Sequence, residues 1–287
     1  MANTYVLYNP ISGNGASIQA SRTLEKFFEG ENLTYFDVTK IASCANFFAS
    51  LQAGEKVVLC GGDGTLNRFA NAVRTFTLQN DVYYYPTGSG NDFWSDINKT
   101  KDDGPVLLNE YLKDLPTVTV KGQTSAFING VGYGIDGYCC EEGDRLRAQS
   151  NKPVNYAGIA IKGLLFHFKP KNAVITVDGQ EYTFKKVWIA ATMHGRYYGG
   201  GMIPAPQQIR NNADGTVSLF VWHGSGKLST LMAFPSIFKG EHVKKTKMIK
   251  ILTGKEITVR FDKPNPCQID GETVSDVTEY TVKSGKL

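Results

Sequence analysis

Residues 57–73 read VVLCGGDGTLNRFANAV, and this stretch decides the fold. Val57–Cys60 is a short apolar run rich in β-branched residues, which predicts a strand buried on both faces of a parallel sheet. Thr65 then precedes a predicted helix and is expected to be its N-cap. The apolar residues of that helix recur at i, i+3, i+4 and i+7, on one face: Leu66, Phe69, Ala70 and Val73.

Between strand and helix lies the turn Gly61–Gly62–Asp63–Gly64. Such turns at the carboxyl edge of an open α/β sheet bind ligands, and a helix N-terminus offers N–H groups to an anion. A carboxylate next to a phosphate is repulsive unless a cation lies between them. We therefore interpret Asp63 as an acid that meets phosphate through Mg²⁺, directly or through water. A tight turn with an Asp helix cap explains the segment alone equally well.

The composition is that of an ordinary soluble globular protein of one large or two ordinary domains. The chain has 287 residues, 41% of them hydrophobic and 20% charged. Its net charge of +4 is small and scattered, which does not favour nucleic-acid binding. The five cysteines, an odd number mostly within apolar runs, indicate reduced thiols in a cytosol. We expect neither a signal peptide nor a transmembrane span, so contact with a membrane would be made from the surface.

The first third of the chain alternates strands with helices, which predicts a doubly wound parallel sheet. From about residue 116 strand-like runs dominate, and Asp178–Gly179 has the signature of a type I′ hairpin. We therefore expect an α/β domain over residues 1–118 and an antiparallel β-sandwich domain over residues 119–287. The expected strands of the first domain are 4–8, 35–39, 57–60 and 82–85, with helices at 17–28 and 45–51 and after the glycine turn. In the second domain they are 125–129, 173–177, 182–184, 187–192, 217–222, 248–252 and 257–261, with a helix at 154–168.

Two further glycine-bearing turns, at residues 9–15 and 86–92, also follow predicted strands. Because the carboxyl ends of parallel strands share one edge of a sheet, such turns would form a phosphate cleft with Asp63 and Asp92 on its rim. Taken alone, the 86–92 turn is better explained as a polar loop with Asn or Asp caps, and the 9–15 turn is a weak signal. The candidate phosphate-binding residues of all three turns are Asn9, Ser12, Gly13, Gly61, Gly62, Gly64, Thr65, Gly88, Ser89 and Asn91.

Near the C-terminus, Asp270–Gly271–Glu272 follows a predicted strand. One carboxylate could serve as a base and the other as a metal ligand, but Asp-Gly is also a common hairpin turn, and that interpretation is the stronger for this segment alone. GYGIDG at residues 132–137 matches a dinucleotide-binding pattern, yet no clear βαβ unit surrounds it. Lys244–Lys247 is most simply a solvated loop, with contact to an anionic membrane as the lesser alternative.

Together these motifs resemble the catalytic unit of the diacylglycerol kinase family, especially its bacterial soluble lipid kinases. GGDGT at residues 61–65 is shared with NAD kinases, but its combination with GSGND at 88–92 and IDGE at 269–272 is far more specific. The resemblance implies ATP as phosphoryl donor, Mg²⁺ as cofactor and a lipid hydroxyl as acceptor. It also implies work at the cytoplasmic face of a membrane, and a homodimer is compatible with it.

The resemblance also implies residue roles. Asp63 and Asp92 correspond to members of a Mg²⁺–water network. Asp270 corresponds to the general base, with Glu272 beside it. Asp214 resembles the acid of a structural cation site in the second domain.

The chain departs from the family pattern at several positions. Arg68 stands where most members carry Glu, Ala72 where they carry Gly, and Trp94 where Ala is usual. The strand at 117–120 lacks an Asp that many members have there. Our leading hypothesis is a lipid kinase. The alternatives are a kinase of a soluble alcohol, as in NAD kinase, and a nucleotide- or lipid-binding protein that has lost catalysis.

Overall fold

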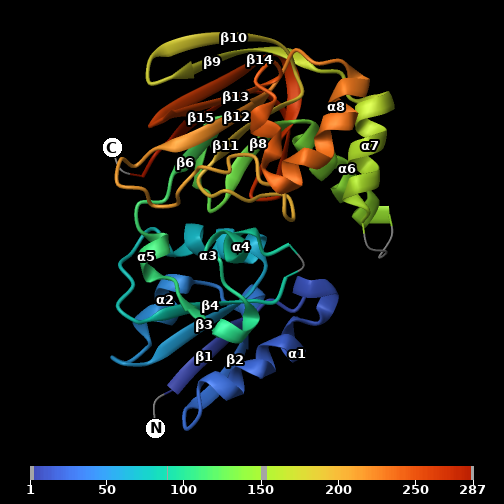
Figure 1. Cartoon of the computed structure of the whole chain (residues 1–287). Coiled ribbons are helices and arrows are strands. Elements are labelled where there is room, and N and C mark those ends of the chain that lie inside the picture. The colour runs from blue at the N-terminus through green and yellow to red at the C-terminus, as the bar shows by residue number, and fades with distance from the viewer. Residues whose placement is uncertain (1–2, 89, 150–153, 286–287) are drawn as a thin grey trace. The chain divides into compact units, whose positions relative to one another are not determined.

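The computed structural model describes residues 3–88, 90–149 and 154–285 (Figure 1). The chain divides into two compact units, Met1–Leu115 and Pro116–Leu287. Each unit has its own sheet and its own hydrophobic core. No helix among the described residues is long and apolar enough to cross a membrane.

Unit 1 is built on a five-stranded sheet with the order β2-β1-β3-β4-β5. The first four strands are parallel and β5 is antiparallel to β4, so the predicted parallel sheet is confirmed with one antiparallel edge. Tyr8 is opposite Cys60 and Gly61 is opposite Pro86, so three strands end in line. The strands are β1 (Asn3–Tyr8), β2 (Asn32–Asp37), β3 (Lys56–Gly61), β4 (Val82–Pro86) and β5 (Val106–Leu107).

The helices of unit 1 cover both faces of this sheet, with α1 on one side and α2 and α3 together on the other (Figure 1). The predicted helix at 17–28 is an α-helix followed by a 3₁₀ segment, Thr23–Phe27. Side chains such as Val6, Leu24 and Val58 form the core. The helices are α1 (Ser17–Arg22), α2 (Cys44–Ala49), α3 (Asp63–Val73), α4 (Asp92–Asp96) and α5 (Asn109–Leu112).

The N-cap prediction for α3 is wrong by three residues. The cap is Gly62, and the helix begins at Asp63. Thr65 therefore lies inside the first turn of the helix. The Thr65 hydroxyl contacts the side chains of Asn9 and Ser12 in the turn after β1 instead of capping the helix.

Unit 2 is an antiparallel ten-stranded sheet, as predicted. The Asp178–Gly179 hairpin is confirmed, with φ of 47° and 84° at its two central residues. The predicted strand at 125–129 is confirmed only at residues 125–126, which end β7, because residues 127–129 connect β7 to β8. The strands are β6 (Thr117–Val120), β7 (Gln123–Ala126), β8 (Gly130–Gly134), β9 (Lys171–Val177), β10 (Gln180–Val187), β11 (Ile189–Met193), β12 (Val217–Trp222), β13 (Ile249–Gly254), β14 (Glu256–Ile269) and β15 (Glu272–Lys283).

The long strand β14 joins the two layers of the sandwich. Its first half, Ile257–Phe261, pairs with β9, whereas its last residues, Cys267–Ile269, pair with β8. Register shifts against β15 lie between these halves, and irregularities of this kind bend a strand. Residues from both layers meet in one core, in which the rings of Tyr133 and Phe261 stack with centroids 4.0 Å apart.

The outer face of the β8-β11-β12-β13 layer is covered by α6 (Ile135–Gln149), by α8 (Lys227–Ala233) and by the turn that follows α7 (Tyr156–Lys162), while α7 itself packs against α6. β11 and β12 are therefore buried on both faces. The predicted helix at 154–168 is α7 followed by a π-helical turn, Gly163–His167. Sequence analysis missed α6, although GYGIDG is a strand-to-helix turn after all, within an antiparallel sheet. The helical periodicity of α6 is obscured because residues 141–147 are mostly charged.

Candidate functional site

Three glycine-bearing turns meet at one edge of the unit 1 sheet. The strand order reverses between β1 and β3, since β2 lies on one side of β1 and β3 and β4 on the other. Such a switch point at the carboxyl ends of parallel strands is where open α/β sheets bind ligands. The turns after β1, β3 and β4 are those that the sequence singled out.

The turns touch through their backbones. A Cβ on Gly88 would lie 2.4 Å from the Cα of Gly62, and one on Gly13 would lie 2.4 Å from the carbonyl oxygen of Thr87. Both distances are too short for a real side chain. Gly13 also has φ of 59°, a conformation that favours glycine. These glycines are therefore required for the turns to approach one another.

Side-chain hydrogen bonds join the same turns. Asn9 Nδ2 donates to Thr65 Oγ1 at 2.8 Å, and Ser12 Oγ lies 3.2 Å from the same oxygen. Ser17 Oγ and Thr87 Oγ1 are 2.8 Å apart. Asn9 and Thr65, both predicted to bind phosphate, thus connect the β1 turn to the first turn of α3.

Asp63 connects the β3 turn to the β4 turn. Its two carboxylate oxygens accept the backbone N–H groups of Asp92 at 2.8 Å and Phe93 at 2.9 Å. These donors are the first residues of α4, so Asp63 accepts N–H groups that have no partner within that helix, from the neighbouring turn. Asp92 is buried beside it. The Tyr84 pKa is raised well above its usual value, first by burial and then by the nearby negative charges of Asp63 and Asp92.

The other predicted residues of unit 1 lie in the same turns. Gly61 ends β3, and its carbonyl accepts the N–H groups of Thr87 and Gly88. Gly64 is in the first turn of α3. Asn91 adopts the left-handed conformation and donates from Nδ2 to the Gly88 carbonyl at 2.8 Å. Ser89 lies outside the described residues.

In unit 2, Asp270 and Gly271 form the hairpin turn between β14 and β15, with φ of 46° and 92°. The Asp270 carboxylate points back to the segment between β7 and β8. Oδ2 accepts the N–H of Ile128 at 2.5 Å, and Oδ1 accepts those of Asn129 and Gly130 at 2.8 and 2.9 Å. The hairpin interpretation of this turn is therefore confirmed, and the role of Asp270 as a base stays a prediction. Glu272 is exposed at the start of β15.

The sequence analysis did not single out two side chains beside this segment. Arg210 donates to the Ile128 carbonyl, and at 2.9 Å to Asn129 Oδ1. The backbone N–H of His194 donates to the Asn129 carbonyl at 2.9 Å. Burial and the charge of Arg210 hold the pKa of His194 well below its usual value, so the ring is neutral at physiological pH. No local sequence signal marks Arg210, because its partners are about 80 residues away.

Asp136, within the GYGIDG motif, is a buried acid. Among the described residues, neither of its carboxylate oxygens has a hydrogen bond of normal geometry. Burial raises its pKa to about 6, and nearby donors such as the Gly137 N–H and the Tyr198 hydroxyl oppose this only in part. Gln268 also faces Asp136, and its Oε1 accepts the Gly271 N–H at 2.7 Å. The Gln268 side chain therefore lies between Asp136 and the Asp270–Gly271 turn.

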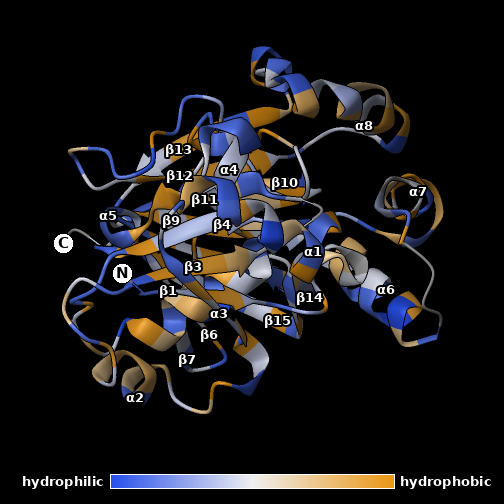
Figure 2. Ribbon diagram, turned by 90° about the horizontal axis from the view of Figure 1, so that it is seen from below, coloured by the Kyte–Doolittle hydropathy of each residue, from blue (hydrophilic) through white to orange (hydrophobic). Residues whose placement is uncertain are grey.

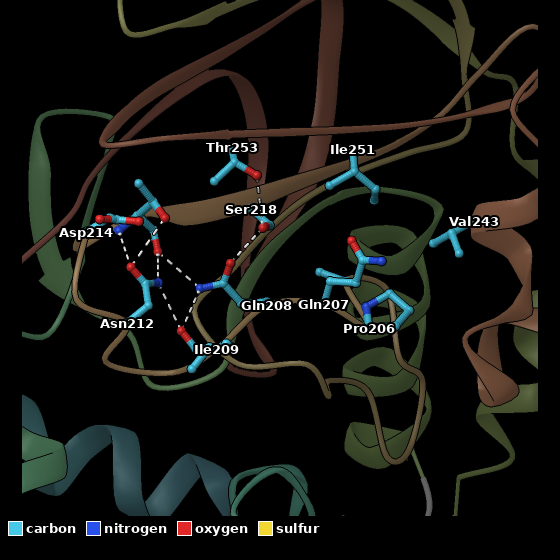
Figure 3. Close-up of a pocket in the computed structure, with 12 residues that line it drawn as sticks. Pro206, Gln207, Gln208, Ile209, Asn212, Asp214, Ser218, Val243, Ile251 and Thr253 are labelled. Atoms are coloured by element: carbon cyan, nitrogen blue, oxygen red, sulfur yellow. Dashed lines mark hydrogen bonds between the residues drawn. The ribbon is translucent and has the colours of Figure 1, made fainter.

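Asp214 is exposed and lines a pocket of about 470 Å³ within unit 2 (Figure 3). The polar end of the pocket is organised by Gln208, which accepts from Ser218 Oγ at 2.6 Å and donates to the Thr216 carbonyl at 3.0 Å. Asn212 Oδ1 accepts the Thr216 N–H at 3.0 Å. The polar groups that line the pocket with Asp214 are thus neutral side chains and carbonyl groups rather than other acids.

Comparison with known proteins identifies the family. Residues 3–119 match the family model of the diacylglycerol kinase catalytic domain, and residues 129–284 match that of the YegS C-terminal NAD kinase beta sandwich-like domain. The chain belongs to the diacylglycerol kinase family. The resemblance that the motifs predicted is therefore confirmed, and with it the assignment to a family of lipid kinases.

The chain is 22% identical over 272 residues to a diacylglycerol kinase of Mycobacterium tuberculosis, an alignment that covers 90% of this chain and 84% of that protein. A crystal structure of a diacylglycerol kinase from Bacillus anthracis str. Sterne matches the structure with a TM-score of 0.61 at 18% identity. That match covers 99% of this chain and 93% of the other. It confirms the predicted fold of both units.

Kinases of this family imply ATP, and the glycine turns of unit 1 fit its phosphates. Gly62 provides no side chain to cap α3, and the first-turn N–H groups of a helix have no partner within the helix. For a metal, the described residues contain no group of three acidic, histidine or cysteine side chains that could hold an ion. Mg²⁺ in kinases is commonly held by one or two carboxylates together with water and substrate phosphates. Asp63 and Asp92 are the two acids of these turns that fit that arrangement, and each Asp63 oxygen also accepts one backbone N–H.

The contact between the glycine turns predicts graded effects of two alanine substitutions. Gly88→Ala places a Cβ 2.4 Å from Gly62 Cα, whereas Gly62→Ala places one 3.2 Å from Gly88 Cα. Gly88→Ala should destabilise the protein by about 1–3 kcal/mol and weaken ATP binding, and Gly62→Ala should do so less. Thermal unfolding and ATP titration of both variants measure this. Equal effects, or none, would contradict the close approach.

Asp136 predicts a pH-dependent stability. Its folded pKa of about 6 exceeds the usual value of 3.8, so the folded state retains a proton that the unfolded state loses between these pH values. The free energy of unfolding should therefore fall by about 3 kcal/mol in total as pH rises from 4 to 6, and it should stay at the lower value above pH 6. The side chain introduced by Asp136→Asn does not titrate. The free energy of unfolding of this variant should therefore increase relative to that of wild type as pH rises through this window. Urea unfolding at pH 4, 5, 6 and 7 tests this, and parallel pH curves for the two proteins would rule it out.

Proposed function

We propose that the protein is an ATP- and Mg²⁺-dependent lipid kinase that transfers the γ-phosphoryl group to a lipid hydroxyl such as that of diacylglycerol. It would act at the cytoplasmic face of a membrane. The observation that carries this proposal is the meeting of three glycine turns and two acids at the switch point of the unit 1 sheet. The name of the Mycobacterium tuberculosis relative supports diacylglycerol as the acceptor.

The glycine turns provide the phosphate site. Side-chain-free backbone at Gly13, Gly62 and Gly88 allows close approach of the triphosphate, and the α3 N-terminus favours negative charge. Ser12 and Thr65 place hydroxyl groups at the same point. Phosphoryl transfer needs mainly positioning and charge neutralisation, so a cradle of this kind can replace the lysine of a P-loop.

Asp92, with Asp63 acting through water, would hold Mg²⁺ beside these phosphates. The ion would supply charge neutralisation when bound. In the same proposal Asp214 is the acid of a structural cation site, with neutral oxygens such as those of Asn212 and Gln208 around it. Arg68 is exposed on α3, so this departure from the family pattern leaves the buried face of the helix unchanged.

Asp270 would be the general base. It would take the proton of the acceptor hydroxyl while that oxygen attacks the γ-phosphorus and ADP leaves. Three backbone N–H groups orient its carboxylate, as a catalytic group requires. Glu272, two residues further on, would assist at the same turn.

The first experiment is phosphate transfer from γ-labelled ATP, with Mg²⁺, to a panel of lipids in mixed micelles. Wild type should label at least one lipid. Asp270→Asn should lower turnover by about 10²-fold or more while ATP binding persists, because the base is lost. Silence across the panel with ATP binding intact would favour a soluble acceptor or a binding protein. Turnover by Asp270→Asn at the wild-type rate would remove the base assignment.

Asp178→Asn is the matched control for Asp270→Asn. Asp178 also begins an Asp-Gly hairpin turn with positive φ, and its carboxylate accepts the N–H groups of Lys255 and Glu256 at 2.9 and 2.8 Å. It therefore loses the same kind of turn-stabilising hydrogen bond. Asp178→Asn should show a comparable loss of thermal stability with no loss of turnover, which separates a structural effect from a chemical one.

The metal role predicts that Asp92→Asn raises the Mg²⁺ concentration needed for half-maximal activity by about tenfold or more, because one carboxylate ligand is lost. Asp63→Asn should have a smaller effect of the same sign. Asp103→Asn is the control, since Asp103 also accepts a backbone N–H, that of Thr100 at 2.7 Å, outside the glycine turns. Mg²⁺ titrations that superimpose for wild type and Asp92→Asn would refute the assignment.

A further inference from the structure

One surface of unit 2 exposes large apolar side chains that the described fold does not cover. Phe166 and Met232 are each 70% exposed, and Leu228 is 66% exposed. These side chains come from α8 and from the π-helical turn that follows α7. Together with two further exposed residues they form what we call the apolar patch: Ile161, Phe166, Leu228, Met232 and Phe238.

The segments that carry the patch pack against each other. α8 contacts the Gly163–His167 turn, and Lys227 Nζ donates to the Leu165 carbonyl at 2.8 Å. Figure 1 shows α7 and α8 next to each other, and Figure 2 shows hydrophobic residues on both.

The opposite sides of these segments already fill the core, through side chains such as Leu164, Ala233 and Ile237. The segments are therefore apolar on two faces, whereas a surface helix needs only one. The outer face is available to an additional partner.

The segments that carry the patch are positively charged. Residues 154–171 and 222–240 contain no Asp or Glu, while Lys162, Lys227 and Lys239 are exposed within them. After the exposed Glu241, the chain continues into the lysine-rich segment 244–250, also exposed at Lys244, Lys245 and Lys247.

The acids on the neighbouring helix α6 are engaged locally. Glu142 pairs with Arg145 at 2.5 Å, Asp144 accepts from Thr273 at 2.7 Å, and Glu141 accepts from Ser275 at 2.5 Å. Hydrogen bonds from Thr273 and Ser275 leave the negative charges of Asp144 and Glu141 in place. The segments that carry the patch itself hold lysines and no acid. Apolar side chains beside these lysines complement a bilayer whose surface is anionic.

We propose that the apolar patch docks the protein onto a bilayer that contains anionic phospholipid. The apolar side chains enter the boundary between headgroups and acyl chains, and the lysines lie at the phosphate level. The inference rests on the proposed function, because a lipid acceptor is reached at a bilayer surface. It deepens that function by assigning membrane contact to one surface.

Cosedimentation of the full chain with vesicles, without ATP, tests the patch. Wild type should bind phosphatidylcholine vesicles that contain phosphatidylglycerol more tightly than phosphatidylcholine alone, and binding should weaken as salt rises. Phe166→Gln/Met232→Gln should weaken partitioning by about tenfold or more, because two inserting side chains are lost. Lys162→Gln/Lys239→Gln should remove most of the preference for the anionic vesicles.

Ile209→Gln is the matched control, because Ile209 is 68% exposed in unit 2 but lies outside the patch, and its vesicle binding should equal that of wild type. Wild-type partitioning by Phe166→Gln/Met232→Gln would overturn the proposal. So would a wild-type dimer that this double substitution converts to a monomer with vesicle binding unchanged, since the patch would then be a subunit interface.

Activity on a short-chain diacylglycerol dissolved as monomers separates this proposal from the proposed function. Phe166 and Met232 lie outside the glycine turns and the Asp270 turn, so the double variant should retain this turnover while losing vesicle binding. Failure of wild type to phosphorylate any lipid counts against the proposed function. Unchanged vesicle binding of the double variant counts against the patch.

Discussion

The backbone contact between Gly62 and Gly88 is the constraint on which the unit 1 site depends. A Cβ on Gly88 would be 2.4 Å from Gly62, so the β3 and β4 turns can meet only without side chains. Once they meet, the Asp63 carboxylate reaches the N–H groups that begin α4. The same acid therefore organises two turns and stands beside Asp92 at the predicted phosphate site, so structure and chemistry depend on one residue.

Unit 2 contains two Asp-Gly hairpin turns of the same kind that have different roles. Asp178 and Asp270 each begin an Asp-Gly hairpin turn with positive φ, and each carboxylate accepts backbone N–H groups from a distant segment. The Asp178 turn ties neighbouring strands of one layer together. The Asp270 turn is different, because β14 has by then crossed to the other layer, where β8 and the buried Asp136 lie. The bend in β14 thus brings the proposed base to a crowded polar region.

Strands buried on both faces also explain the helices of unit 2. β11 and β12 are buried along their whole lengths, so the layer they form needs a cover on its outer face. α6, α8 and the turns that follow α7 and α8 provide that cover, and these turns bury Leu164 and Ile237 against it. α7 and α8 remain apolar on their outer side as well, which the core does not require. That excess is consistent with a membrane-facing role.

Local sequence determined the four parallel strands and first three helices of unit 1, the antiparallel character of unit 2 and the turns that carry candidate residues. Strand and helix periodicity and Gly or Asp turn chemistry are local properties, whereas the short elements β5, α4 and α5 were not predicted. Local sequence also indicated the family. Tertiary structure decided the rest. Thr65 contacts Asn9 rather than capping α3, and Arg210 reaches Asn129 from about 80 residues away. Asp136 is buried in α6, and the helical periodicity of α6 is obscured by the mostly charged residues 141–147. These outcomes depend on packing between distant segments, which no local pattern encodes.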